Sequence, residues 1–169
     1  MALALTVDID EILRRAGWCP RAVLESTLAL ADDIACEGHE GASVGALFTI
    51  GNADRVLEWS RSLILDPLQG HVPGATHITD PRLRGTAKQL AHLDGAFVIA
   101  NDGTVTAACR YLAAPATSVK LPLGLGSRHF AAAAMSKHLG IIGVVVSQSG
   151  SVRVFCEGEL VVERRLRNP

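Results

Sequence analysis

GLGSRHFAAAAMS, residues 124–136, is the stretch around which the chain is organised. Its two leading glycines allow a tight turn and a close approach of the backbone to a ligand. Ser127 is a good N-cap residue and the following alanines favour a helix, so we predict a helix that starts here. Its free N–H groups, with Arg128 and His129 beside them, indicate an anion pocket. The alternative is an ordinary glycine-closed loop in which Arg128 and His129 are solvated.

The composition is that of one globular domain, because 49% of the 169 residues are apolar and 20% are charged. A net charge of −1 gives no electrostatic reason to expect nucleic acid or an anionic membrane as a partner. The N-terminus is acidic where a secretory signal is basic, and the longest apolar stretch, residues 139–146, is too short for a membrane span. We therefore expect a soluble, cytoplasmic protein.

The four cysteines are too widely spaced for a zinc motif or a disulfide framework, which predicts four buried, reduced thiols: Cys19, Cys36, Cys109 and Cys156. His71 and His77 lie in a loop rich in proline and glycine, residues 65–79. A metal site there is conceivable, but exposed loop histidines are the expectation.

Hydrophobic periodicity and turn signals place helices at residues 8–16, 20–37, 54–63 and 80–91, and another from residue 127. Strands are expected at 43–50, 97–100, 104–111, 141–147, 152–156 and 160–166, with a hairpin turn at 101–103 and a β-meander at the end. The predicted fold is a single α/β domain with a central mixed β-sheet flanked by helices on both faces.

Asp94 comes just before the strand at 97–100. A carboxylate at the mouth of a buried strand needs backbone donors, a cation or a metal as its partner. Considered alone, such a residue is more often a cap or turn residue than a catalytic one.

Two motifs in order carry a family resemblance: Asp94-Gly95-Ala96 opens a hairpin, and LGSRH, residues 125–129, opens a helix about thirty residues later. They resemble the diadenylate cyclase domain, the nucleotidyltransferase domain of DNA-integrity-scanning proteins. Its pattern is D-G-A, then G-[TS]-R-H-R, then a strand that ends in V-V-S-E. The resemblance implies a diadenylate cyclase-like nucleotide-binding domain at 41–169, with N-terminal helices at 1–40 packed on it.

By that resemblance, Asp94 would align the attacking ribose hydroxyl and help to hold a divalent metal, Mg²⁺ or Mn²⁺. Gly95 and Ala96 would let the backbone approach ATP, and Leu112 would contact adenine. The triphosphate would lie against the residues of the second motif, and a further serine lies where the family contacts phosphate or metal: Gly126, Ser127, Arg128, His129 and Ser147. The implied catalytic residues are Asp94, Arg128 and His129.

The reaction implied by the resemblance joins two ATP molecules into cyclic di-AMP and releases two pyrophosphates. Each 3′-hydroxyl attacks the α-phosphorus of the other ATP, so two protomers must face each other in a homodimer or higher homo-oligomer.

Two residues depart from the family pattern: Phe130 replaces the second arginine and Gln148 replaces a glutamate. These two departures leave open a second hypothesis, in which the chain is a non-catalytic module that senses ATP or the cyclic dinucleotide. A third possibility is an interaction domain whose glycine loop is structural. Product formation separates the first two hypotheses, and nucleotide binding separates both from the third.

Overall fold

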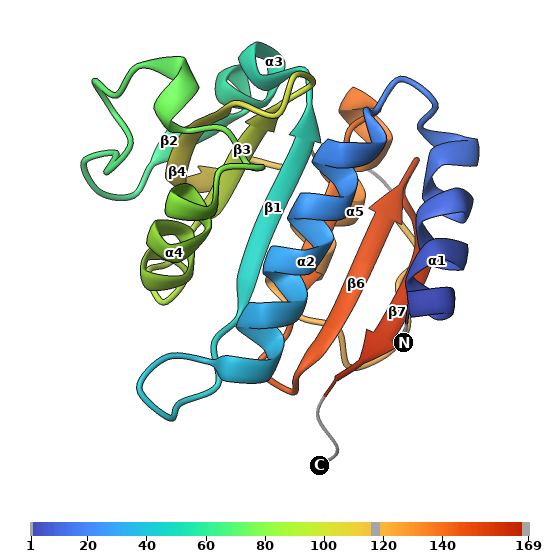
Figure 1. Ribbon diagram of the computed structural model, residues 1–169. Coiled ribbons are helices and arrows are strands. Elements are labelled where there is room, and N and C mark those ends of the chain that lie inside the picture. The colour runs from blue at the N-terminus through green and yellow to red at the C-terminus, as the bar shows by residue number, and fades with distance from the viewer. Residues whose placement is uncertain (1, 116–118, 167–169) are drawn as a thin grey trace.

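The computed structural model describes residues 2–115 and 119–166. Seven strands in these ranges form one mixed sheet in the order β2-β4-β3-β1-β5-β6-β7 (Figure 1). Only β1 and β3 run parallel, and all other neighbours are antiparallel. The bounds are β1 (Ala46–Gly51), β2 (Ser60–Ser62), β3 (Ala96–Ala100), β4 (Val105–Leu112), β5 (Ile142–Val146), β6 (Ser151–Cys156) and β7 (Glu159–Arg165).

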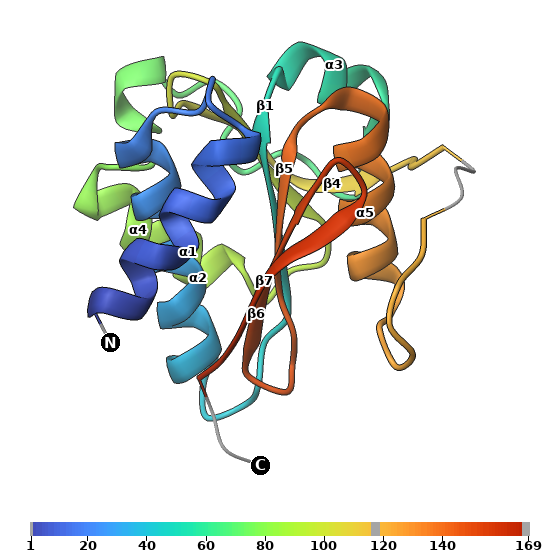
Figure 2. The ribbon, with the colours of Figure 1, turned by 90° about the vertical axis from the view of Figure 1, so that its right-hand side faces the viewer.

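Helices cover both faces of the sheet, as the sequence predicts (Figure 2). The helices α1 (Ala2–Arg15), α2 (Arg21–Glu37) and α4 (Pro81–Leu90) share one core with the sheet, and α3 (Ala53–Glu58) and α5 (Ser127–Leu139) share the other. Alternate residues of β1 divide between them, since Phe48 stacks on Phe97 in the first core and Leu47 lies in the second. The central strand is thus buried on both faces.

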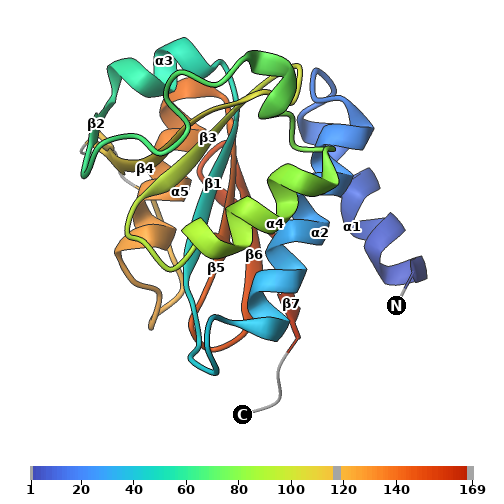
Figure 3. The same cartoon turned by 60° about the vertical axis from the view of Figure 1, so that its left-hand side comes forward.

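The helices α2 and α4 lie side by side on the same face of the sheet (Figure 3), joined by an ion pair of 2.6 Å between Arg84 and Asp33. The expected start of α4 is confirmed, because the Asp80 carboxylate accepts a hydrogen bond from the backbone N–H of Arg82 and Pro81 opens the first turn. This helix leads directly to the loop that carries Asp94.

Close packing against β5 fixes the position of α5. A Cβ built on Gly143 of β5 would lie 2.8 Å from the Cβ of Ala132, so the helix backbone approaches the sheet where both residues are small. The alanine run therefore packs the helix as well as favouring it. As a result, the first turn of α5 lies beside the end of β5 and the start of β1.

Several local expectations were wrong. The helix predicted at 54–63 ends at Glu58, because Ser60–Ser62 instead pair with the edge of β4 as strand β2. Gly126, not Ser127, is the N-cap of α5, and Ser127 is its first helical residue. The first helix begins at Ala2 rather than residue 8. Cys36 is exposed, since its helix presents it to solvent, while the other three cysteines are buried, and no disulfide joins any of them within the described residues.

The hairpin at 101–103 and the terminal β-meander are confirmed. Gly103 takes a φ of +94°, which the tight turn between β3 and β4 requires. No helix within the described ranges is long and apolar enough to cross a membrane. The boundary predicted at residue 40 stays a prediction, although α2 packs directly on the sheet.

Candidate active site

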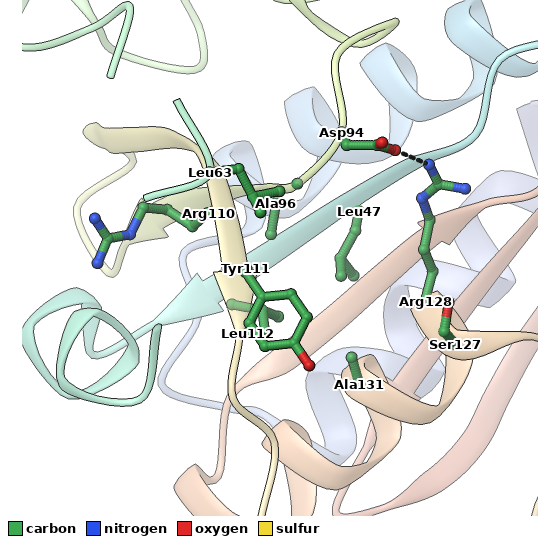
Figure 4. Close-up of a pocket in the computed structure, with 11 residues that line it drawn as sticks. Leu47, Leu63, Asp94, Ala96, Arg110, Tyr111, Leu112, Ser127, Arg128 and Ala131 are labelled. Atoms are coloured by element: carbon green, nitrogen blue, oxygen red, sulfur yellow. Dashed lines mark hydrogen bonds and ion pairs between the residues drawn. The ribbon is translucent and has the colours of Figure 1, made fainter. Parts of the chain in front are cut away.

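A cleft of about 400 Å³ opens between the start of β3, the end of β4 and the first turn of α5 (Figure 4). Apolar side chains from β1, β3, β4 and α5, and Leu63 just after β2, form part of its wall, and charged side chains stand at its rim. The lining residues are Leu47, Leu63, Asp94, Gly95, Ala96, Arg110, Tyr111, Leu112, Ser127, Arg128 and Ala131. An apolar wall with a few convergent polar groups is typical of a small-molecule site.

Asp94 and Arg128 meet across the mouth of this cleft. The Nη2 of Arg128 donates to Oδ1 of Asp94 at 3.0 Å (Figure 4), which supplies the cation partner that the sequence leaves open for Asp94. The Asp94 side chain is 86% exposed, while that of Arg128 is 35% exposed. The carboxylate therefore stays accessible to a ligand, and the guanidinium is the more buried of the two groups.

Gly95 is required by the neighbouring strand. Its φ is +110°, and a Cβ at this position would lie 2.5 Å from the carbonyl carbon of Cys109 on β4. Cys109 itself has a φ of +54°, and the pairing of β3 with β4 shifts register nearby. The glycine thus lets β3 begin against an irregular strand, which places Asp94 at the rim.

Gly45 is a site residue that sequence reasoning missed. A Cβ here would lie 2.9 Å from Nη1 of Arg128 and 3.2 Å from the carbonyl oxygen of Val146. The Arg128 guanidinium therefore packs on the bare backbone that precedes β1. No local signal marks Gly45, because its role comes from a residue distant in sequence.

A second, smaller cleft of about 140 Å³ adjoins the first at the N-terminus of α5. It is lined by Gly126, Ser127, Arg128, His129, Val145, Val146, Ser147 and Gln148. Ser127 and Arg128 line both clefts, so the two form one continuous region around the helix start. The first N–H groups of a helix have no acceptor within it, and they favour an anion at this point.

In the smaller cleft, Ser147 is held by hydrogen bonds to neighbouring residues, whereas His129 is held by burial. The Ser147 hydroxyl lies 2.6 Å from that of Ser149 and accepts a hydrogen bond from the backbone of Ser151 at 3.3 Å. His129 is only 7% exposed. Burial, then the nearby Arg153 and Arg128 cations, lower the pKa of His129 to about 4. His129 is therefore neutral at physiological pH, and the alternative in which it is solvated is wrong.

Tyr111 and Arg110 are further lining residues that sequence reasoning did not single out. Tyr111 is 49% exposed, and its ring faces the cleft (Figure 4) and has the Arg61 guanidinium 4.7 Å from its centre. The guanidinium of Arg110 is tied to β2 by hydrogen bonds to Ser60 and Ser62. These contacts depend on strand β2, which was predicted as helix, so the pattern gave no signal for them.

The structure thus brings the two motifs together: each residue that the resemblance assigned to ATP lines one of the two clefts. In the described ranges no cluster of three or more His, Cys, Asp or Glu side chains could hold a metal by itself. His77 is instead bonded to Thr79 and to the carbonyl oxygen of Asp102. Asp94 remains the candidate ligand for a metal.

The chain matches the DAC family, described as DisA bacterial checkpoint controller nucleotide-binding, over residues 33–160. A protein named diadenylate cyclase from Methanocaldococcus jannaschii is 40% identical over 159 residues, which make up 94% of this chain and 50% of that protein. Another of that name from Haloferax volcanii is 36% identical over 143 residues, 83% of this chain and 52% of that protein. The chain spans about half the length of these curated relatives.

Two solved structures share the fold. A hypothetical membrane spanning protein from Bacillus cereus superposes with a TM-score of 0.58 at 19% identity, covering 80% of this chain and 60% of that one. DacA from Staphylococcus aureus, crystallised as a double mutant, gives a TM-score of 0.54 at 22% identity, covering 86% and 87%. These likenesses support the α/β architecture described above.

Proposed function

Because the chain belongs to the diadenylate cyclase (DAC) family, we propose that it condenses two ATP molecules into cyclic di-AMP and releases two pyrophosphates. One observation carries the proposal: Asp94 and Arg128 meet at 3.0 Å where the large cleft joins the small cleft at the start of α5. A carboxylate able to orient a hydroxyl group therefore stands beside a site built for phosphates.

We place the adenosine in the large cleft and the phosphates at the start of α5. The Leu47 and Leu112 side chains give the large cleft an apolar floor, and the exposed ring of Tyr111 offers a flat surface for stacking a base. Arg128 and the free N–H groups of α5 would bind the triphosphate, with the small cleft providing Ser147 and His129.

The 3′-hydroxyl of one ATP must attack the α-phosphorus of the other, with pyrophosphate as the leaving group. Asp94 would orient the hydroxyl and accept its proton as the new phosphorus–oxygen bond forms, and Arg128 would offset the charge that develops on the phosphoryl oxygens. The ion pair with Arg128 fixes the direction of the carboxylate before the substrate binds. Most of the rate enhancement would thus come from positioning and charge.

The donor set fits a divalent cation shared with the substrate. Mg²⁺ is commonly bound by one or two carboxylates together with substrate phosphates and water. Asp94 offers one accessible carboxylate beside the phosphate site, so it would hold Mg²⁺ or Mn²⁺ only together with ATP. When bound, such a cation would neutralise phosphate charge during the transfer.

A second copy of the chain would bind the second ATP, because the paired cleft around the start of α5 has one adenosine region and one phosphate region. Exposed apolar side chains at the cleft and on the elements that form it support this arrangement. Leu63 lines the cleft, Leu65 follows it on the loop after β2 and is 91% exposed, and Phe130 lies in the first turn of α5. Exposed apolar side chains are expected where two protomers meet.

Phe130 and Gln148 modify this site without removing its parts. Phe130 is 41% exposed and does not line either cleft, so the missing guanidinium leaves Arg128 in place. Gln148 lines the small cleft and can still donate or accept a hydrogen bond there, but it adds no charge. We infer that turnover depends steeply on the added metal.

The test is to incubate the purified protein with ATP and either Mg²⁺ or Mn²⁺ and to detect cyclic di-AMP by mass spectrometry. We expect product from the wild type and none from Asp94→Asn, which keeps the size of the side chain and removes its charge. Gly85→Ala, in α4 away from both clefts, is the matched control and should be active. If the protein binds ATP but makes no product with either metal, the cyclase proposal is rejected in favour of the nucleotide-sensing module.

A further inference from the structure

His129 has one face in the small cleft and another in the core. It lies in the first turn of α5, lines the small cleft, and packs edge-on against Phe155 of β6 with the ring centres 6.2 Å apart. The imidazole is therefore held between the phosphate region and the sheet. The ring nitrogen that carries the proton determines whether the imidazole presents a hydrogen-bond donor or an acceptor to the small cleft.

Arg153 of β6, on the core side of the ring, determines the tautomer of His129. Its Nη1 lies 3.3 Å from Nε2 of His129, in hydrogen-bonding geometry. A guanidinium has donors only, so Nε2 must be the unprotonated acceptor. A neutral imidazole has one ring proton, and that proton must then be on Nδ1.

Arg153 is itself held firmly. Its Nη2 donates to Oε1 of Glu163 at 2.7 Å, and the two residues are opposite each other on β6 and β7. The Arg153 side chain is 12% exposed. It does not line either cleft, so it reaches a bound ligand only through the His129 ring.

The charged groups around His129 come from three elements. Arg128 on the same helix and Arg153 on β6 oppose its protonation, whereas Glu163 on β7 favours it. Burial has the largest effect, the two arginines add to it, and the pKa of His129 falls to about 4. Geometry and electrostatics therefore agree on a neutral ring.

We propose that Arg153 is a positioning residue that holds His129 as the neutral Nδ1–H tautomer, so that the ring is a fixed hydrogen-bond donor to an anion in the small cleft. It does not act there as a titrating acid or base. The identity of the anion, an ATP phosphate, rests on the proposed function. The tautomer does not, since the contact with Arg153 fixes it in the free protein.

The test is NMR of the protein labelled with ¹⁵N-histidine, without nucleotide, from about pH 8 to pH 5. The signal of His129 is identified by its loss in His129→Gln. We expect the Nδ1–H pattern in the wild type, without titration above pH 5. In Arg153→Met the ring should lose this preference and titrate closer to 6.5. Arg165→Met is the matched control, because Arg165 also pairs with Glu163 but is exposed and should leave the spectrum unchanged.

ATP binding gives a second readout. In Arg153→Met, affinity should fall several-fold at pH 8 and recover relative to the wild type as the pH falls and the freed ring gains a proton. A loss that is the same at every pH would mean a merely structural role and would overturn the proposal. So would a wild-type His129 that is charged or Nε2-protonated at pH 7, which can be measured even if Arg153→Met fails to fold. Neither NMR result depends on cyclase activity.

Discussion

Gly45→Ala should weaken ATP binding while leaving the fold intact. The new methyl group would lie 2.9 Å from Nη1 of Arg128, closer than carbon and nitrogen atoms normally approach. The guanidinium is the free end of a flexible side chain, so it moves aside and its 3.0 Å contact with Asp94 is lengthened or lost. The contact of 3.2 Å with the carbonyl oxygen of Val146 is tight but tolerable.

The expected magnitude follows from that displacement. Removing a charged hydrogen bond costs about 1.5–3 kcal/mol, and a displaced guanidinium keeps part of it. We therefore expect a loss of about 1 kcal/mol, or about five-fold in the dissociation constant for ATP. The free energy of unfolding should change by less than about 1 kcal/mol, since only a side chain on the rim has to move.

Calorimetric titration with ATP in the absence of metal measures the affinity without turnover. The control is Gly85→Ala, where an added methyl meets no atom within 4 Å. A double-mutant cycle then tests the cause: in an Arg128→Ala background, Gly45→Ala should have almost no further effect on ATP affinity. An equal loss in both backgrounds would refute the reasoning, because the methyl would then act on something other than Arg128.

Three further predictions concern the same site. Arg128→Ala should weaken ATP binding by ten-fold or more, from the loss of a charged hydrogen bond worth about 1.5–3 kcal/mol, and unchanged affinity by calorimetry would contradict the phosphate placement. The pKa of His129 is about 4 in the folded protein against an ordinary value of 6.5, so the unfolded chain binds the extra proton between these pH values and stability falls as the pH falls. Chemical unfolding at pH 7 and pH 4 should show the wild type losing about 3 kcal/mol more than His129→Gln, and parallel losses would show that His129 is not buried neutral. The nucleotide-bound protein should be a dimer by light scattering, with Leu65→Asp weakening the dimer but not the fold, since this side chain is 91% exposed; a monomer that still makes product would contradict the shared site.

Much of the fold could be predicted because its signals are local. The turn at 101–103 and the proline at the start of α4 depend on neighbouring residues, and the helix at 127 needs only its glycine and alanine neighbours. Strand β2 was not predicted, because its signal is not local. Ser60–Ser62 continue a helical pattern, and only pairing with β4 makes them a strand.

The candidate site likewise has residues that could be predicted from the sequence and residues that could not. Asp94 and Arg128 could be assigned to one site only through the family resemblance of their two motifs, because the local sequence left the partner of Asp94 open. Gly45 and Arg153 could not be, because each acts on a side chain of α5 that is distant in sequence. Their roles emerge only when the packing of β1, β6 and α5 is known.

The most direct test of the central claim is to follow the isotopic composition of the product. The protein is incubated with metal and an equal mixture of ordinary ATP and ATP labelled with ¹³C in the adenosine. The masses of the products are then measured by mass spectrometry. The cyclase account predicts cyclic di-AMP in light, mixed and heavy forms, with the mixed form the most abundant, and no product from Asp94→Asn. Retention of both labelled and unlabelled ATP without any cyclic dinucleotide, in wild-type protein that binds ATP, would contradict it.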